Sequence, residues 1–204
     1  MYYAFDRRWL RSTVTVALVA MNVVLYLAVA LTKDTLYALG VLDVDKVLVS
    51  HEYNRLVSAM FLHESLSHLF GNMILLFYIG AVVERNLGHI LYTILYLGSG
   101  IVGNVMTVFY EVTHREHWVS LGASGAVFGV MGAMLVLLLL TPKEKRFGSS
   151  LLPRIVFMVA YSLYTGLRST AVNNIAHIAG LLCGAILGFL FIAPRKNIDL
   201  DALL

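Results

Sequence analysis

The chain of 204 residues is 59% hydrophobic and only 13% charged, with a formal net charge of +3. About a quarter of the residues of an ordinary soluble domain are charged, so this composition excludes that class. We expect one polytopic membrane domain over residues 1–204, with no room for a sizeable soluble domain.

Six apolar runs follow one another along the chain: Thr13–Leu31, Ser67–Val83, Ile90–Tyr110, Val119–Leu140, Leu151–Leu167 and Ile175–Ala193. Most approach the roughly 20 residues that a helix needs to cross the hydrocarbon core. Because lipid tolerates only helices or closed barrels, we predict an all-α bundle of six transmembrane helices. Pro153 and Arg154 interrupt the start of the fifth run. The first run is too long for the apolar core of a cleavable signal peptide, so we expect it to be retained.

The longest connection, residues 32–66, lies between the first two runs and is not simply polar, because apolar residues alternate with charges along it. We expect an external loop that packs on the membrane surface or against the bundle and contains short helical pieces. No internal repeat is present in the sequence, which argues against an inverted-repeat transporter.

The basic residues predict the orientation. Ten of the fifteen lysines and arginines fall on one side of the predicted bundle, in residues 1–12, in the second-to-third and fourth-to-fifth connections and in residues 194–204. By the positive-inside rule, the N-terminal segment 1–12 and the tail 194–204 are both expected to be cytoplasmic. We interpret these clusters as topology signals and expect no nucleic-acid partner.

Two polar residues stand inside membrane-length runs, where lipid penalises polar side chains. Ser124 lies about one turn inside the outer end of the fourth run, and His177 lies at a similar depth in the sixth. We expect a dyad in which His177 accepts the hydroxyl proton while Ser124 attacks a carbonyl. None of the apolar runs holds an acid that could orient the histidine, so a triad is not expected. Taken singly, the serine fits helix packing and the histidine fits a hydrogen bond between helices.

Small residues line one face of each of these two runs, with many of them four positions apart: Gly122, Gly125, Gly129 and Gly132 in the fourth, and Ala176, Gly180, Gly184 and Gly188 in the sixth. Faces of small residues let membrane helices approach closely. The two runs that hold Ser124 and His177 are therefore expected to pack tightly together.

A third polar pair opens the second run. His68 and Asn72 are four residues apart, so both side chains point from the same face of a helix. Two hydrogen-bond donors at the outer end of an apolar helix fit an oxyanion hole, and the backbone N–H of Ser124 is a third candidate donor.

A zinc site is the chemical alternative. The residues from His63 to His68 resemble the zinc signature H-E-x-x-H with one residue too many. On a regular helix this spacing turns the two imidazoles about 140° apart, so we discount a shared metal and expect no metal or cofactor. Cys183, the single cysteine, is expected to be a small buried hydrophobe.

From Arg55 to Ala193 the chain resembles the rhomboid intramembrane serine proteases in their six-helix prokaryotic form. The motifs that carry the resemblance are G-x-S-G at Gly122 to Gly125, A-H-x-x-G at Ala176 to Gly180, H-x-x-x-N at His68 to Asn72, G-x-x-x-E-x-x-x-G around Glu84, and the arginine of a Trp-Arg pair at Arg55. Two positions depart from the family pattern. Asn54 stands where Trp is usual, and Phe128 stands where some members have a Tyr that stacks on the catalytic histidine.

The resemblance implies an endopeptidase that cleaves the transmembrane segments of single-pass proteins within the lipid bilayer. It further implies a structural role for Glu84, a preference for a small residue before the cut, substrate entry gated by the fifth helix, and a location in the plasma membrane of a prokaryote. The alternatives are a catalytically inactive rhomboid-like protein that binds transmembrane helices, and a small transporter.

Overall fold

The computed structural model describes residues 12–32, 35–141, 151–169 and 172–194. Its elements in chain order are α1 (Thr13–Leu31), α2 (Thr35–Gly40), α3 (Val44–Leu48), α4 (Arg55–Ser58), the 3₁₀ turn η2 (Ala59–Phe61), α5 (Leu66–Leu75), the π-helical turn η3 (Leu76–Gly80), α6 (Ala81–Leu87), α7 (His89–His114), α8 (Ser124–Leu140), α9 (Leu151–Leu167) and α10 (Asn174–Ile192). The predicted all-α membrane bundle is confirmed. Within the described residues, the only β-type pairing is one isolated bridge between Leu42 and Ser120.

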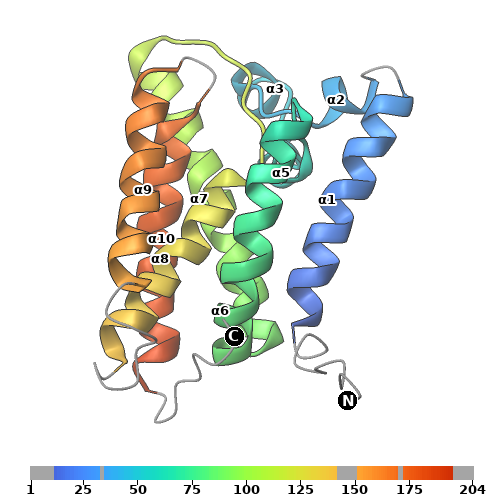
Figure 1. Cartoon of the computed structure of the whole chain (residues 1–204). Helices are drawn as coiled ribbons and strands as arrows, with labels where there is room; N and C mark the ends of the chain where they lie inside the picture. Colours follow the sequence, from blue (N-terminus) through green and yellow to red (C-terminus); the bar gives the residue numbers. More distant parts are fainter. Residues whose placement is uncertain (1–11, 33–34, 142–150, 170–171, 195–204) are drawn as a thin grey trace.

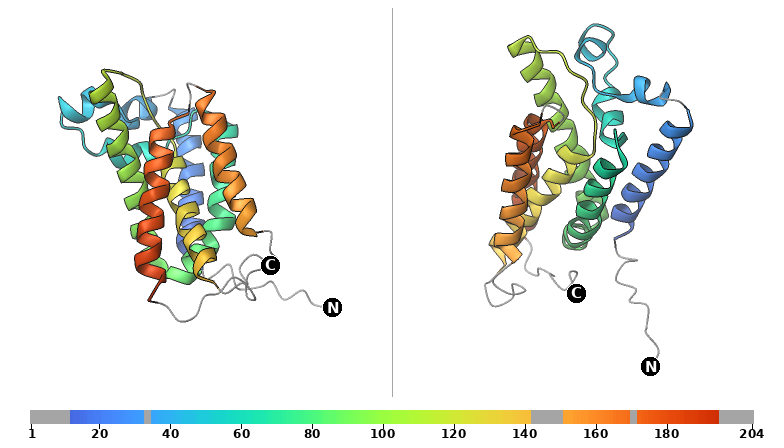
Figure 2. Two further views of the ribbon diagram at one scale, coloured as in Figure 1. Left: turned by 90° about the vertical axis from the view of Figure 1, so that its left-hand side faces the viewer. Right: turned by 45° about the horizontal axis from the view of Figure 1, so that its top comes forward.

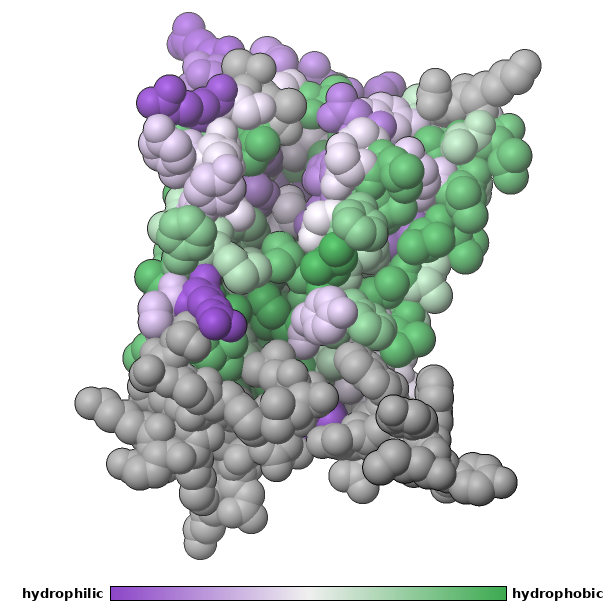
Figure 3. Space-filling view, in the orientation of Figure 1, coloured by the Kyte–Doolittle hydropathy of each residue, from purple (hydrophilic) through white to green (hydrophobic). Residues whose placement is uncertain are grey.

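Four of the described helices are long and apolar enough to cross a membrane: α1, the continuous helix Leu66–Leu87 formed by α5, η3 and α6, and then α7 and α10. Two shorter apolar helices, α8 and α9, have 17 residues each. Figure 3 shows hydrophobic side chains across the middle of the molecule and hydrophilic ones gathered at its upper end. Such an apolar belt is the surface that lipid requires of a bundle.

Most predicted helix boundaries agree closely with the structure. The first and fifth runs match α1 and α9 residue for residue, and the sixth begins and ends within one residue of α10. The fourth prediction is wrong at its start, because α8 begins at Ser124 rather than at Val119. Residues 115–123 enter the bundle as a non-helical segment, and Figure 1 shows α8 starting well below the upper end of α7.

At the centre of the bundle, α8 is buried along most of its length and packs against α7 and α10 (Figures 1 and 2). A Cβ added at Gly180 would overlap the backbone of Gly125, and one added at Gly184 would overlap the backbone of Gly129. The predicted tight packing of these two glycine-lined faces is confirmed. The third partner, α7, also uses small residues, since a Cβ at Gly103 would lie 3.0 Å from the carbonyl oxygen of Ala176.

The segment between α1 and α5 packs against the bundle rather than extending away from it. Leu42, Val44 and Val47 are buried in one cluster with Val108 of α7. Arg55, itself only 3% exposed, ties the segment together, because its guanidinium donates to the carbonyl oxygens of Ala38 and Val41 and its Nε to the carboxylate of Glu52. The predicted short helical pieces are confirmed as α2, α3, α4 and η2. Asn54 precedes α4 without forming a side-chain cap.

At the opposite end of the bundle, Glu84 anchors the start of α1. Its carboxylate accepts from the backbone N–H groups of Val14 and Thr15 at 2.9 and 2.7 Å, from the Thr15 hydroxyl at 2.6 Å and from His89 at 2.6 Å. Because the first N–H groups of a helix have no intrahelical acceptor, this buried carboxylate acts as a cap supplied by another helix. The geometry fits the structural role that the resemblance implies for Glu84.

Much of the predicted orientation signal lies outside the described residues. This applies to the predicted cytoplasmic segment over residues 1–11, to the basic residues within 142–150 and to the predicted tail from residue 195 onward.

Candidate active site

Ser124 is the first residue of α8, and the segment before it is held firmly. Ser120 pairs with Leu42 through two backbone hydrogen bonds of 2.9 and 3.0 Å, and the N–H of Gly122 donates to the carbonyl oxygen of Ala59 at 2.9 Å. The segment between α1 and α5 thus fixes the approach to Ser124. Gly122 has a φ of +125°, and a Cβ there would lie 2.8 Å from the ring of His68, so only glycine fits.

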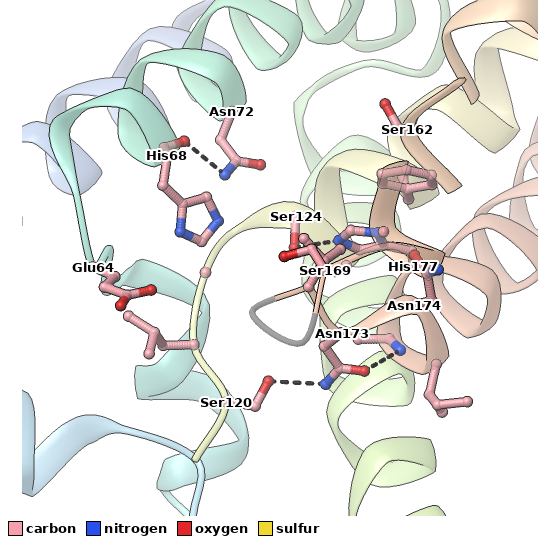
Figure 4. A pocket seen from close by; sticks show the side chains of 18 of the residues that line it. Glu64, His68, Asn72, Ser120, Ser124, Ser162, Ser169, Asn173, Asn174 and His177 are labelled. Carbon is pink, nitrogen blue, oxygen red and sulfur yellow. Dashed lines mark hydrogen bonds between the residues drawn. The ribbon is translucent and has the colours of Figure 1, made fainter. Parts of the chain in front are cut away.

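His177 lies in the first turn of α10, with its Nε2 2.8 Å from the Oγ of Ser124 (Figure 4). The imidazole is 7% exposed, and the ring of Phe128 stacks on it with centroids 4.2 Å apart and planes 7° from parallel. Phe128 therefore makes the ring contact expected at this position, without a hydroxyl group. Among the described residues, the Nδ1 of His177 has no hydrogen-bond partner, so no described acid orients the ring.

One detail of the predicted depth is wrong. Ser124 does not sit a turn inside its helix but begins it, with Ala123 as the N-cap residue. The serine therefore lies where the first backbone N–H groups of α8 lack intrahelical acceptors and where the helix dipole favours negative charge. A nucleophile at this position has hydrogen-bond donors beside it from its own backbone.

His68 and Asn72 lie on α5, across the cavity from His177, and the imidazole of His68 points toward Ser124 (Figure 4). The Nδ2 of Asn72 donates to the backbone oxygen of His68 at 3.0 Å, which leaves its second hydrogen for another acceptor. Both side chains thus lie on the same side of the cavity, opposite the ring of His177.

These side chains line one cleft of about 920 Å³ between α5, α9, the 115–123 segment and the start of α10. The predicted site residues that border it are Ser124, His177, His68, Asn72, Gly122, Gly125 and Phe128. The other three lie elsewhere: Gly180 packs behind the dyad against Gly125, Arg55 supports the segment between α1 and α5, and Glu84 caps α1.

His63 does not lie on a helix with His68, contrary to the assumption made from the sequence. It precedes α5, which begins at Leu66, so the regular helical spacing used to separate it from His68 does not apply. Its ring packs edge-on against that of His68, with centroids 5.1 Å apart. Burial, together with the neighbouring His68, lowers the pKa of His63 to about 4. Over the described ranges, no group of three or more His, Cys, Asp or Glu side chains could hold a metal ion.

The sequence reasoning missed Asn173, which precedes α10 and caps it. Its Oδ1 accepts from the N–H of Ala176 at 3.0 Å, while its Nδ2 donates to Thr107 and Ser120. An Asn directly before an apolar helix is a standard N-cap signal, so the cap was visible in the sequence. The two other bonds were not, because their partners lie 66 and 53 residues away.

The chain is similar in sequence to one family of known proteins. The rhomboid domain model matches residues 50–194. Among similar proteins, RHOMBOID-like protein 6, mitochondrial, of Arabidopsis thaliana is 37% identical over 166 residues, which are 81% of this chain and 52% of that protein. RHOMBOID-like protein 1 of the same plant is 36% identical over 78% of this chain and 39% of its own length. The chain thus spans about two fifths to one half of these plant relatives.

A bacterial relative is matched over most of both chains. The putative rhomboid protease YdcA of Bacillus subtilis (strain 168) is 31% identical over 172 residues, which are 83% of this chain and 80% of that protein. Together with the domain match and the helical membrane bundle, this similarity shows that the chain belongs to the rhomboid family.

Proposed function

We propose that this protein is an intramembrane serine endopeptidase whose nucleophile is Ser124 and whose general base is His177. The observation that carries the proposal is the 2.8 Å contact between the Oγ of Ser124 and the Nε2 of His177, at the wall of a cleft inside a membrane bundle. Membership of a family with bacterial relatives named as proteases supports the same activity.

The reaction is acyl transfer in two steps. The Oγ of Ser124 attacks the scissile carbonyl carbon, and the Nε2 of His177 takes the hydroxyl proton. His177 then gives that proton to the leaving amine, which frees the C-terminal product and leaves an acyl ester on Ser124. Water attacks the ester carbonyl while His177 takes its proton, the bond from the acyl carbon to the Oγ of Ser124 breaks, and His177 returns the proton to that Oγ as the carboxylic acid product departs.

The tetrahedral intermediate carries a negative charge on its oxygen, which needs donors that are already in place. We assign this role to the ring of His68, the free amide hydrogen of Asn72 and the backbone N–H of Ser124. The proposal is supported by the position of the first two across the cleft from His177 and by the position of Ser124 at the start of α8. Gly122 allows the His68 ring to approach without obstruction.

The substrate class that we propose is the transmembrane segment of single-pass membrane proteins. The cleft is bordered by α5 on one side and α9 on the other, which supports lateral entry of a chain from the lipid with α9 as the gate. A helical substrate must unwind to present its carbonyl, so Gly or Pro near the cut should increase cleavage. Serine and asparagine side chains along the cleft, such as Ser162 and Asn174, provide a polar path for water.

We further propose that residues 1–204 form a single membrane domain in the plasma membrane of a prokaryote, with both termini cytoplasmic and the cleft facing outward. The outward assignment is supported by Arg85 at the end of α6 and Arg154 at the start of α9, which lie at the end of the bundle opposite the hydrophilic upper end in Figure 3, because lysine and arginine gather on the cytoplasmic side.

The test is cleavage of a model single-pass substrate by the purified protein in detergent, with Ser124→Ala as the matched control. We expect a defined cut in or near the transmembrane segment with the wild type and none with the variant. Cleavage that persists in the variant would overturn the assignment. Substrate binding without cleavage by the wild type would instead support the non-catalytic, helix-binding alternative.

A further inference from the structure

Asn173 joins three separate parts of the site through one side-chain amide. Its Oδ1 caps α10 by accepting from the N–H of Ala176 at 3.0 Å. Its Nδ2 donates to the hydroxyl oxygen of Thr107 on α7 at 2.8 Å. The same nitrogen donates to the hydroxyl oxygen of Ser120 at 2.9 Å (Figure 4). The amide thus bridges α10, α7 and the segment that leads into α8.

The bond between Asn173 and Ser120 lies close in sequence to both members of the dyad. Ser120 lies four residues before Ser124, and Asn173 lies four residues before His177. One hydrogen bond therefore joins the two segments that deliver the nucleophile and the base. Both segments are short, since neither attachment point is more than four residues from the group it positions.

Both acceptors of the amide are themselves fixed. Ser120 is bonded through its backbone to Leu42, and Thr107 is fully buried, with its hydroxyl donating to the carbonyl oxygen of Gly103 at 3.0 Å. Because its partners do not move freely, the Asn173 amide can hold the start of α10 in one place relative to Ser124.

We propose that Asn173 is a positioning residue that sets the distance between Ser124 and His177. The inference rests on the proposed function. It also goes beyond capping, because a helix cap requires only an acceptor, which Ser, Thr or Asp would supply equally well. The two donated hydrogen bonds require the amide nitrogen, and they are the part that links the two segments.

The substitution that separates the two roles is Asn173→Ser. Serine retains a capping oxygen but is too short to reach Thr107 and Ser120, so the bridge is lost while the cap is kept. A displacement approaching 1 Å between reacting groups costs up to about a hundredfold in rate. For partial loosening we expect kcat to fall about tenfold and KM to stay within about twofold, since substrate contacts elsewhere in the cleft are unchanged.

Ser120→Ala tests the same bond from its other end, because it deletes a single hydroxyl and leaves the cap intact. We expect it to lower kcat severalfold, and the double variant with Asn173→Ser to be little worse than Asn173→Ser alone, since both remove one shared interaction. The matched control is Asn22→Ser, which removes a buried amide on α1 that donates to the carbonyl oxygen of Leu18. This control should keep kcat near the wild-type value, even if its melting temperature falls as much as that of Asn173→Ser.

The outcome is decisive in either direction. If Asn173→Ser and Ser120→Ala both keep kcat within twofold of the wild type, or if the two effects multiply in the double variant, the positioning role is overturned. Should Asn173→Ser fail to fold, the kcat of Ser120→Ala alone decides. Hydrogen exchange gives a readout that does not depend on proteolysis: loss of the bridge should raise exchange in residues 119–123 and in the first turn of α10 together. A wild type that cleaves nothing refutes the proposed function, whereas exchange still tests the bridge.

Discussion

Gly180→Ala is the substitution that most directly tests whether close helix packing creates the site. A Cβ at Gly180 would overlap the carbonyl oxygen of Gly125 and lie 2.9 Å from its carbonyl carbon. Carbon atoms in good contact are about 3.5 Å apart, so α8 and α10 must separate by at least about 0.6 Å, and further to clear the oxygen. Since the obstruction is backbone, no side-chain rotation relieves it.

The expected loss of cleavage follows from the place where the added methyl group separates the two helices. Gly125 adjoins Ser124, and Gly180 follows His177 by three residues, so the separation falls directly on the 2.8 Å contact between them. A shift approaching 1 Å at reacting groups costs up to about a hundredfold in rate, and we expect cleavage to fall by between about ten- and a hundredfold. Overpacking should also lower the free energy of unfolding by about 1–3 kcal/mol.

The assay compares cleavage rates of a model substrate with the reversible unfolding of each variant in detergent. Gly98→Ala is the matched control, because it lies on α7, and its added Cβ would sit at an ordinary 3.5 Å from a methyl group of Leu187 on α10. This control should cleave at close to the wild-type rate. If Gly180→Ala cleaves within twofold of Gly98→Ala, the idea that glycine contacts set the Ser–His distance is refuted.

Substitutions at three further positions probe other parts of the structure. Gly122→Ala should reduce cleavage at least about tenfold, because the added methyl meets the His68 ring and the backbone φ of +125° is strained for alanine; a normal kcat would contradict the oxyanion assignment. Phe128→Leu should lower the cleavage rate by removing the ring stacked on His177, whereas Phe128→Tyr should keep it, and equal rates for the two would argue against the stacking. Glu84→Ala should lower the free energy of unfolding by about 3 kcal/mol, because it leaves the first N–H groups of α1 without an acceptor. Since this site is far from the cleft, Ser124 of the folded fraction should still react. An unchanged melting temperature would contradict the capping role of Glu84.

The hydropathy pattern predicted the positions of the helices well, but it did not predict where an apolar segment is not helical. The limits of α1 and α9 follow from apolar length alone. Residues 119–123 are as compatible with a membrane helix as those that follow, so composition could not indicate that α8 starts only at Ser124. What stops the helix is tertiary: the backbone of this segment pairs with Leu42 and Ala59, from a part of the chain about 60 to 80 residues earlier.

The candidate site could be predicted from the sequence because its polar residues lie in membrane-length apolar runs, where polar side chains are unfavourable. Ser124, His177, His68 and Asn72 are polar groups in apolar runs, and the structure brings all four to one cleft. The bridging bonds of Asn173 and the edge-on contact of His63 with His68 depend on how loops fold back on the helices. Sequence periodicity carries no information on such contacts, so only the three-dimensional structure shows them.

The most direct measurement of the central claim is peptide mapping of the protein after reaction with a fluorophosphonate, which labels activated serines. The account predicts one adduct per chain, on Ser124, and its loss in His177→Ala even though the serine is still present. Labelling of a different serine, or equal labelling of Ser124 in His177→Ala, would contradict the claim that these two residues act as a dyad.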